Sequence, residues 1–95
     1  MKKLLALAAL AMLSAPAQAA PPTADQEAEF YRVCFKISEN ETLCKCKVEA
    51  ARKLIDSDFM AVVIASMEGK TPDAKYYDAY NEYVGRSNQI CKPEY

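Results

Sequence analysis

The chain contains no histidine. Histidine is the usual general acid or base near neutral pH and the commonest metal ligand, so its absence excludes most hydrolytic and catalytic metal centres. It also excludes the Cys-x-x-Cys-His motif that attaches haem. Catalysis would have to rest on carboxylates, lysine, tyrosine or cysteine, and no pattern of these residues indicates a reaction. We therefore expect a protein that is not an enzyme and that needs no cofactor.

Long apolar runs are also missing. The longest run is Leu4–Leu13, whereas a membrane-spanning helix needs about 20 apolar residues. This run follows the basic start Met1–Lys3 and precedes Ala17–Ala19, which is the order of segments in a secretory signal peptide. We predict a signal peptide over residues 1–19 that is cleaved after Ala19. The mature chain, residues 20–95, is then periplasmic or secreted and has no membrane anchor.

The chain has no excess of positive charge. It holds 12 Lys and Arg residues against 13 Asp and Glu residues. Loss of Lys2 and Lys3 with the signal peptide leaves ten basic residues against thirteen acidic ones, a net charge of −3. Nucleic-acid binding relies on basic surfaces that neutralise phosphates, and adsorption to anionic membranes also needs basic clusters. We expect neither kind of partner.

All four cysteines lie in the predicted mature chain. A domain of this size buries too little surface to be comfortably stable, and small exported domains usually add disulfides. An even number of cysteines in an oxidising compartment favours two disulfides, for which three pairings exist. The predicted structural disulfides therefore involve Cys34, Cys44, Cys46 and Cys91.

Capping residues and apolar spacing predict two helices in the first part of the mature chain. Thr23 and Gln26 resemble a capping box at the start of the first helix. Either Ser38 or Asn40 caps the second helix after a tight turn. The second helix is expected to run to about Ile55.

Two further helices follow. Asp56–Asp58 caps the apolar body Phe59–Met67, which ends at Gly69, a suitable left-handed residue. The pair Thr71-Pro72, with the proline at the first helical position, opens a fourth helix that runs to about Cys91. No segment has the alternation of a strand. The sequence thus predicts an all-α fold: one compact bundle of four short helices, cross-linked by two disulfides.

Cys44 and Cys46 are separated by one residue of the second predicted helix, so they lie roughly 160° apart around its axis. They cannot easily bond to each other while the helix persists. Antiparallel packing of the first two helices brings Cys34 level with Cys44 and leaves Cys46 facing Cys91 on the last helix. This geometry favours the pairs Cys34–Cys44 and Cys46–Cys91. The exchanged pairing, Cys34–Cys46 with Cys44–Cys91, is nearly as good.

Reduced cysteines would permit another interpretation, in which the thiols bind copper(I) or zinc and two methionines add soft ligands. The zinc and thioredoxin-like redox sites that use Cys-x-x-Cys spacing have no counterpart here. Metal handling is therefore the alternative to structural disulfides. Its ligand set would be drawn from Cys34, Cys44, Cys46, Cys91, Met60 and Met67.

Tyr76, Tyr80 and Tyr83 share one face of the fourth predicted helix. Tyrosine joins a large apolar ring to a polar tip, which suits both packing between helices and recognition of a partner. This face is either docked on the other helices or partly exposed, as a surface for a partner or a dimer. The three tyrosines are the candidate partner-binding residues.

Lys47 falls inside the apolar arc of the second predicted helix. We expect its stem to follow the surface and its amine to reach water. A buried amine with a perturbed pKa is the alternative. Asp56 and Asp58 resemble a carboxylate pair, but we interpret them as helix caps.

These features favour a small exported protein that binds rather than catalyses. An accessory, chaperone-like or inhibitor-type module fits them best. The expected partner is another envelope protein, and the chain is expected to be a monomer or a weak dimer.

Overall fold

Four α-helices and one short 3-10 helix make up 77% of residues 19–92, the part of the chain that the computed structural model describes. They are α2 (Ala24–Ser38), α3 (Glu41–Leu54), α4 (Ser57–Met67), η1 (Ala74–Tyr76) and α5 (Tyr77–Ile90). Within this range there is no strand, and no helix is long and apolar enough to cross a membrane. The predicted all-α fold of four helices with two disulfides is confirmed. Residues 1–18 of the predicted signal peptide lie outside the described residues.

The start of α2 is fixed by the predicted capping box. The Gln26 backbone N–H donates to the Thr23 hydroxyl at 3.1 Å, and the Thr23 N–H donates to the Gln26 side-chain oxygen at 3.0 Å. The Gln26 amide nitrogen also donates to the backbone carbonyl of Ser57 at 2.9 Å. The same side chain therefore caps α2 and ties it to the first residue of α4.

The turn between α2 and α3 contains an unusual backbone conformation. Glu39 has a φ of 53° and lies in the left-handed region, which is costly for a residue other than glycine. Asn40 then caps α3, because its side-chain oxygen accepts the Leu43 N–H at 3.0 Å. Of the two predicted caps, Asn40 is the one used. Ser38 instead donates from its hydroxyl to the Cys34 carbonyl at 2.9 Å.

The ends of α4 follow the sequence, but the start of the last helix does not. Asp56 caps α4 by accepting the Phe59 N–H at 2.8 Å, and Gly69 beyond its end has a φ of 96°. The prediction that Pro72 takes the first helical position is wrong. Asp73 has an extended backbone, with φ −60° and ψ 148°, and the 3-10 turn begins only at Ala74. A helix cannot include a residue in that conformation.

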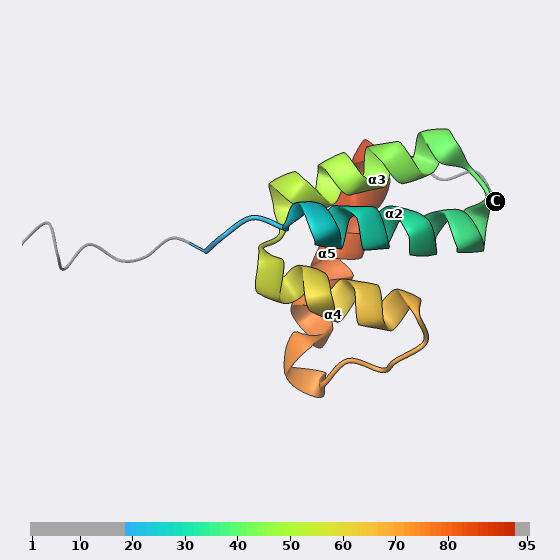
Figure 1. Cartoon of the computed structure of the whole chain (residues 1–95). Helices are drawn as coiled ribbons and strands as arrows, with labels where there is room; N and C mark the ends of the chain where they lie inside the picture. The colour runs from blue at the N-terminus through green and yellow to red at the C-terminus, as the bar shows by residue number, and fades with distance from the viewer. Residues whose placement is uncertain (1–18, 93–95) are drawn as a thin grey trace, which may run out of the picture.

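The core lies where the four helices meet. Helix α2 packs against both α3 and α4, and α5 packs against α3 as it crosses behind the other helices in Figure 1. Burial of each large apolar side chain in such a core contributes about 1.5–3 kcal/mol. The buried cluster consists of Phe30, Cys34, Cys44, Ala51, Met60, Val63, Ile64 and Tyr83.

Candidate binding groove

Two disulfides cross-link the helices. One joins Cys34 of α2 to Cys44 of α3, with their Cα atoms 5.7 Å apart. The other joins Cys46 of α3 to Cys91 at the end of α5, with a Cα separation of 5.8 Å. This is the pairing that the helical geometry of the sequence favoured. Cys44 and Cys46 thus hold α3 to a different helix on each of its sides.

The residues of the metal alternative are not arranged as a set of thiolate ligands. Residues 19–92 include all four cysteines, and each of their sulfur atoms is in a disulfide. Met60 is fully buried in the core, whereas Met67 is half-buried. In the same part of the chain no three His, Cys, Asp or Glu residues form a cluster that could hold a metal ion. A soft-metal site would therefore require reduction of the disulfides first.

The predicted tyrosine stripe packs mainly against α4. Tyr83 is 6% exposed and belongs to the core, and burial raises its pKa to about 12. The Tyr80 hydroxyl oxygen accepts a hydrogen bond from Ser66 at 3.1 Å. The stripe is therefore engaged in helix packing at these two positions.

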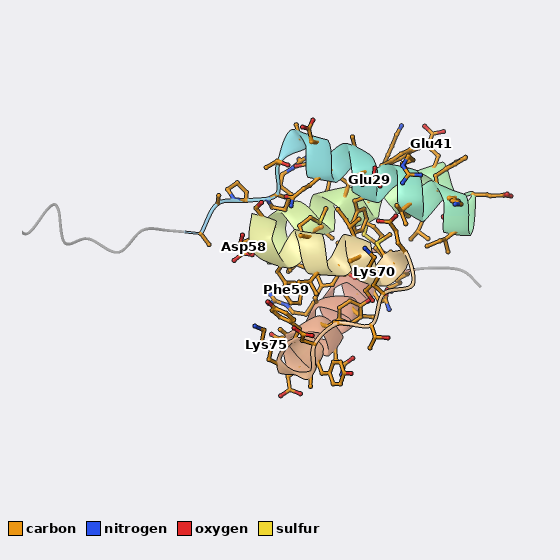
Figure 2. All side chains as sticks on the ribbon, turned by 60° about the horizontal axis from the view of Figure 1, so that its bottom comes forward. Glu29, Glu41, Asp58, Phe59, Lys70 and Lys75 are labelled. Carbon is orange, nitrogen blue, oxygen red and sulfur yellow. A yellow bond between two sulfur atoms is a disulfide. The ribbon has the colours of Figure 1, made fainter. Side chains whose placement is uncertain are left out.

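The third tyrosine of the stripe, Tyr76, is the last residue of η1, directly before α5. The Phe59 side chain extends from α4 toward this segment (Figure 2), and its ring meets the half-buried Tyr76 ring edge-on at 6.0 Å. Tyr77, beside the stripe, is 47% exposed. Tyr77 is therefore more exposed than any of the three candidate tyrosines.

An apolar groove of about 280 Å³ lies beside the stripe, with lining residues from all four α-helices. Its floor is formed by the buried residues Phe30, Cys34, Val63, Tyr83 and Ser87. The lining residues that are half-buried or exposed are mainly apolar, namely Ile37, Leu43, Met67, Tyr80 and Val84, and the polar ones are Ser38, Lys47 and Asn88. Concave sites with an apolar lining and a few polar groups are typical of binding sites.

Lys47 supplies the charge in this groove. Its amine donates to the Ser87 hydroxyl at 2.8 Å and to the side-chain oxygen of Asn88, so it joins α3 to α5. Partial burial lowers the pKa of Lys47 below its usual value, because the charged form loses hydration. The expectation that this amine extends into water therefore fails. The hydrogen bonds to α5 draw it across the interface between the helices.

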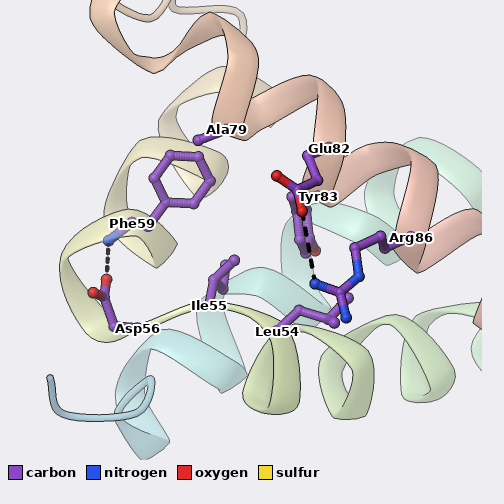
Figure 3. Close-up of a pocket in the computed structure, with 8 residues that line it drawn as sticks. All are labelled: Leu54, Ile55, Asp56, Phe59, Ala79, Glu82, Tyr83 and Arg86. Atoms are coloured by element: carbon purple, nitrogen blue, oxygen red, sulfur yellow. Dashed lines mark hydrogen bonds and ion pairs between the residues drawn. The ribbon is translucent and has the colours of Figure 1, made fainter. Parts of the chain in front are cut away.

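A second pocket, of about 310 Å³, shares Tyr83 with the groove (Figure 3). Its charged side chains already have partners. Arg86 faces Glu82 at 3.8 Å, and the Asp56 carboxylate accepts the Phe59 N–H at 2.8 Å as the cap of α4. The Asp56 interaction agrees with the interpretation of Asp56 as a cap. We regard the groove that contains Lys47 as the stronger candidate binding site, because the Lys47 amine contacts only neutral oxygen atoms in the described chain.

Most groove residues could not be found from the sequence. Val63, Val84 and Ser87 look like ordinary residues of amphipathic helices, and only the fold brings them together. The local signals were the spacing of Tyr80 and Tyr83, which both line the groove, and Lys47, a charge inside an apolar arc. These signals pointed to the site, although they did not identify the partners of the amine.

Comparison with known proteins adds no relative to this description: no protein-family model, curated protein or solved structure matches the chain.

Proposed function

We propose that the chain is a small exported binding protein without catalytic activity, and that its apolar groove receives an apolar segment of another envelope protein. The observation that carries this proposal is the groove itself. Its floor is buried, its rim is mainly apolar, and Ile37 on the rim is 64% exposed. Apolar side chains left at the edge of a concave site gain stability when a partner covers them.

The apolar surface continues beyond the groove, which favours a protein over a small molecule as the partner. Leu43 lines both the groove and a neighbouring pocket. Ile90, which is 55% exposed, lies in that neighbouring pocket. A small ligand confined to the groove could cover Ile37 on its rim but would leave Ile90 in water. A protein segment is long enough to cover both.

A binding role also agrees with the polar groups near the groove. Ser87 donates to the Val84 carbonyl at 3.2 Å and accepts from Lys47, so its hydroxyl is engaged in both directions. A nucleophilic serine needs a general base to take its proton, and the positively charged Lys47 does not do this. The groove can therefore hold a ligand without offering it an obvious reaction.

The export part of the proposal rests on the N-terminal sequence and on the cysteines. The predicted signal peptide would direct the chain to export. The two disulfides are compatible with an oxidising compartment, where such bonds persist.

The proposal is tested with a neutral apolar dye, N-phenyl-1-naphthylamine, whose fluorescence rises in an apolar site. We expect saturable binding to the oxidised protein. Ile37→Glu should weaken it strongly, because the substitution places a charge on the exposed rim and disturbs no buried contact. Phe35→Glu is the matched control, since Phe35 is on the same helix and 43% exposed but does not line the groove. Equal loss in both variants, or no saturable binding, would contradict the proposal.

A further inference from the structure

Lys47 has no carboxylate partner within the described chain. The ion pairs found over residues 19–92 are Arg32–Glu29, Lys45–Glu41, Arg52–Glu27 and Arg86–Glu82. Lys45, two residues away on the same helix, pairs with Glu41 at 2.8 Å. Among the described residues, the Lys47 amine hydrogen-bonds instead to the neutral oxygens of Ser87 and Asn88. Within residues 19–92, this half-buried positive charge in an apolar groove therefore has no opposite charge paired with it.

The chemistry around this charge suits an anion. An ammonium group has three hydrogen-bond donors, and Ser87 and Asn88 use two of them. The Asn88 carboxamide accepts from Lys47 through its oxygen, so its NH₂ group is a further donor beside the ammonium. A carboxylate can accept from both groups, and charge-assisted hydrogen bonds of this kind are the stronger ones.

We infer that the segment bound under the proposed function is the apolar C-terminus of the partner protein, with its last side chain in the groove and its free carboxylate on Lys47. This inference rests on the proposed function and names the ligand class of the same groove.

A chain end fits the groove better than the middle of a chain. Lys47, Ser87 and Asn88 line the groove from α3 and α5, and the hydrogen bonds from Lys47 join these two helices. A terminal residue carries its side chain and its carboxylate on one Cα, so its side chain can enter the groove while its carboxylate accepts hydrogen bonds from Lys47 and Asn88. The volume of about 280 Å³ is also modest. An apolar cavity of about 150 Å³ already holds benzene, so there is room for one large side chain and part of a second.

A free fatty acid shares the carboxylate chemistry but fits the surface less well. A small ligand in a well-formed pocket normally buries about 70–90% or more of its surface. The groove instead opens onto Ile37 and, through Leu43, onto the pocket that contains Ile90. The upstream residues of a protein C-terminus would cover this additional apolar surface.

The test compares an acetylated pentapeptide ending in Leu-Phe with a free carboxylate and the same peptide with a C-terminal amide. Binding is followed by the methyl NMR signals of Val63 and Met67, which line the groove. We expect the free acid to bind about tenfold more tightly, the effect of one charge-assisted hydrogen bond in a partly exposed site. Lys47→Gln should remove this difference, because it keeps the hydrogen-bonding ability but not the charge. Lys53→Gln, which removes an exposed charge from the same helix, should preserve it.

Equal or tighter binding of the amide would overturn the inference, and this comparison in the unaltered protein decides the matter even if Lys47→Gln fails to fold. Octanoate and octanol are measured alongside. If Lys47 discriminates between them but not between the peptides, the occupant is a small amphipathic acid and the C-terminal proposal is wrong. Binding of the neutral dye without either peptide would overturn this inference alone. Absence of dye binding as well would overturn the proposed function.

Discussion

The Lys47 ammonium group donates a hydrogen bond to the Ser87 hydroxyl at 2.8 Å, across the interface between α3 and α5. The Cys46–Cys91 disulfide joins the same α3 to the residue that ends α5. The two links differ in the desolvation free energy that each requires. The disulfide is covalent and apolar, whereas the lysine must give up hydration to reach its partners.

Replacement of Lys47 by Met tests whether this lysine holds the fold together. We expect the free energy of unfolding to change by less than about 1 kcal/mol, because relief from desolvation offsets the lost hydrogen bonds. Ser87 keeps its bond to the Val84 carbonyl in the variant. Urea unfolding measures the difference. A loss of about 3 kcal/mol or more would make Lys47 a structural bridge rather than part of a binding site.

The two disulfides should contribute unequally to stability. The Cys46–Cys91 bond spans 45 positions of sequence and the Cys34–Cys44 bond spans 10. In the loop-entropy model, removal of the longer closure costs about 4 kcal/mol and removal of the shorter one about 3 kcal/mol. Thermal unfolding of the two double Cys→Ala variants measures these losses. If the variant lacking Cys46–Cys91 has the same unfolding midpoint temperature as the unaltered protein, this account of the scaffold is contradicted.

Tyr83 and Tyr77 should respond differently to truncation, although both are on α5. Tyr83 is 6% exposed, so Tyr83→Ala leaves a cavity and should cost about 3–5 kcal/mol. Tyr77 is 47% exposed, and Tyr77→Ala should stay within about 0.5 kcal/mol of the native stability. Denaturant unfolding of both variants checks the pair. Similar values would place Tyr83 on the surface instead of in the core.

The same tyrosine should make stability fall at alkaline pH. Burial raises the folded-state pKa of Tyr83 to about 12, whereas an unfolded tyrosine ionises near pH ~10. Below about pH 10 the hydroxyl is protonated in both states, so its contribution is complete there and is lost as the pH rises toward about 12. The two pKa units correspond to roughly 2–3 kcal/mol. Unfolding measured from pH 9 to 12 should show this loss in the native protein and not in Tyr83→Phe, and equal slopes would contradict it.

The turn between α2 and α3 offers a stabilising substitution. Glu39 has a φ of 53°, a conformation that glycine adopts without a steric penalty. Glu39→Gly should therefore raise the free energy of unfolding by about 0.5–1 kcal/mol, after the greater entropy of glycine in the unfolded chain is taken into account. Lys36→Gly, inside α2, is the control and should lower the free energy of unfolding by about 1 kcal/mol. A loss of stability in Glu39→Gly would show that the side chain makes a necessary contact.

Local signals were sufficient for most of the fold. Thr23 with Gln26, Asn40 and Asp56 each satisfy backbone donors within three residues, so a cap can be identified without knowing the rest of the structure. The helical period together with one tight turn favoured the observed disulfide pairing, but only slightly over the exchanged one. The start of the last helix was misplaced because Pro72 suits both a first helical turn and an extended connection. Asp73 takes the extended conformation.

The candidate site depended on relationships that are distant in sequence. Lys47 and Ser87 are 40 residues apart, and nothing in either neighbourhood indicates the other. The sequence could identify Lys47 as out of place in an apolar arc, but the direction of its amine was set by the position of α5. The tyrosines were conspicuous by their spacing. Tyr80 and Tyr76 contact Ser66 and Phe59 of α4, and Tyr80 also lines the groove.

Met67 and Met60 provide the most direct test of the groove. They are the two methionines of residues 20–95; Met67 lines the groove, and Met60 is fully buried in the core. In oxidised protein labelled with carbon-13 at the methionine methyl groups, titration with N-phenyl-1-naphthylamine should shift the Met67 signal saturably and leave the Met60 signal in place. An unchanged Met67 signal, or equal shifts of both signals, would contradict the proposal that this groove is the binding site.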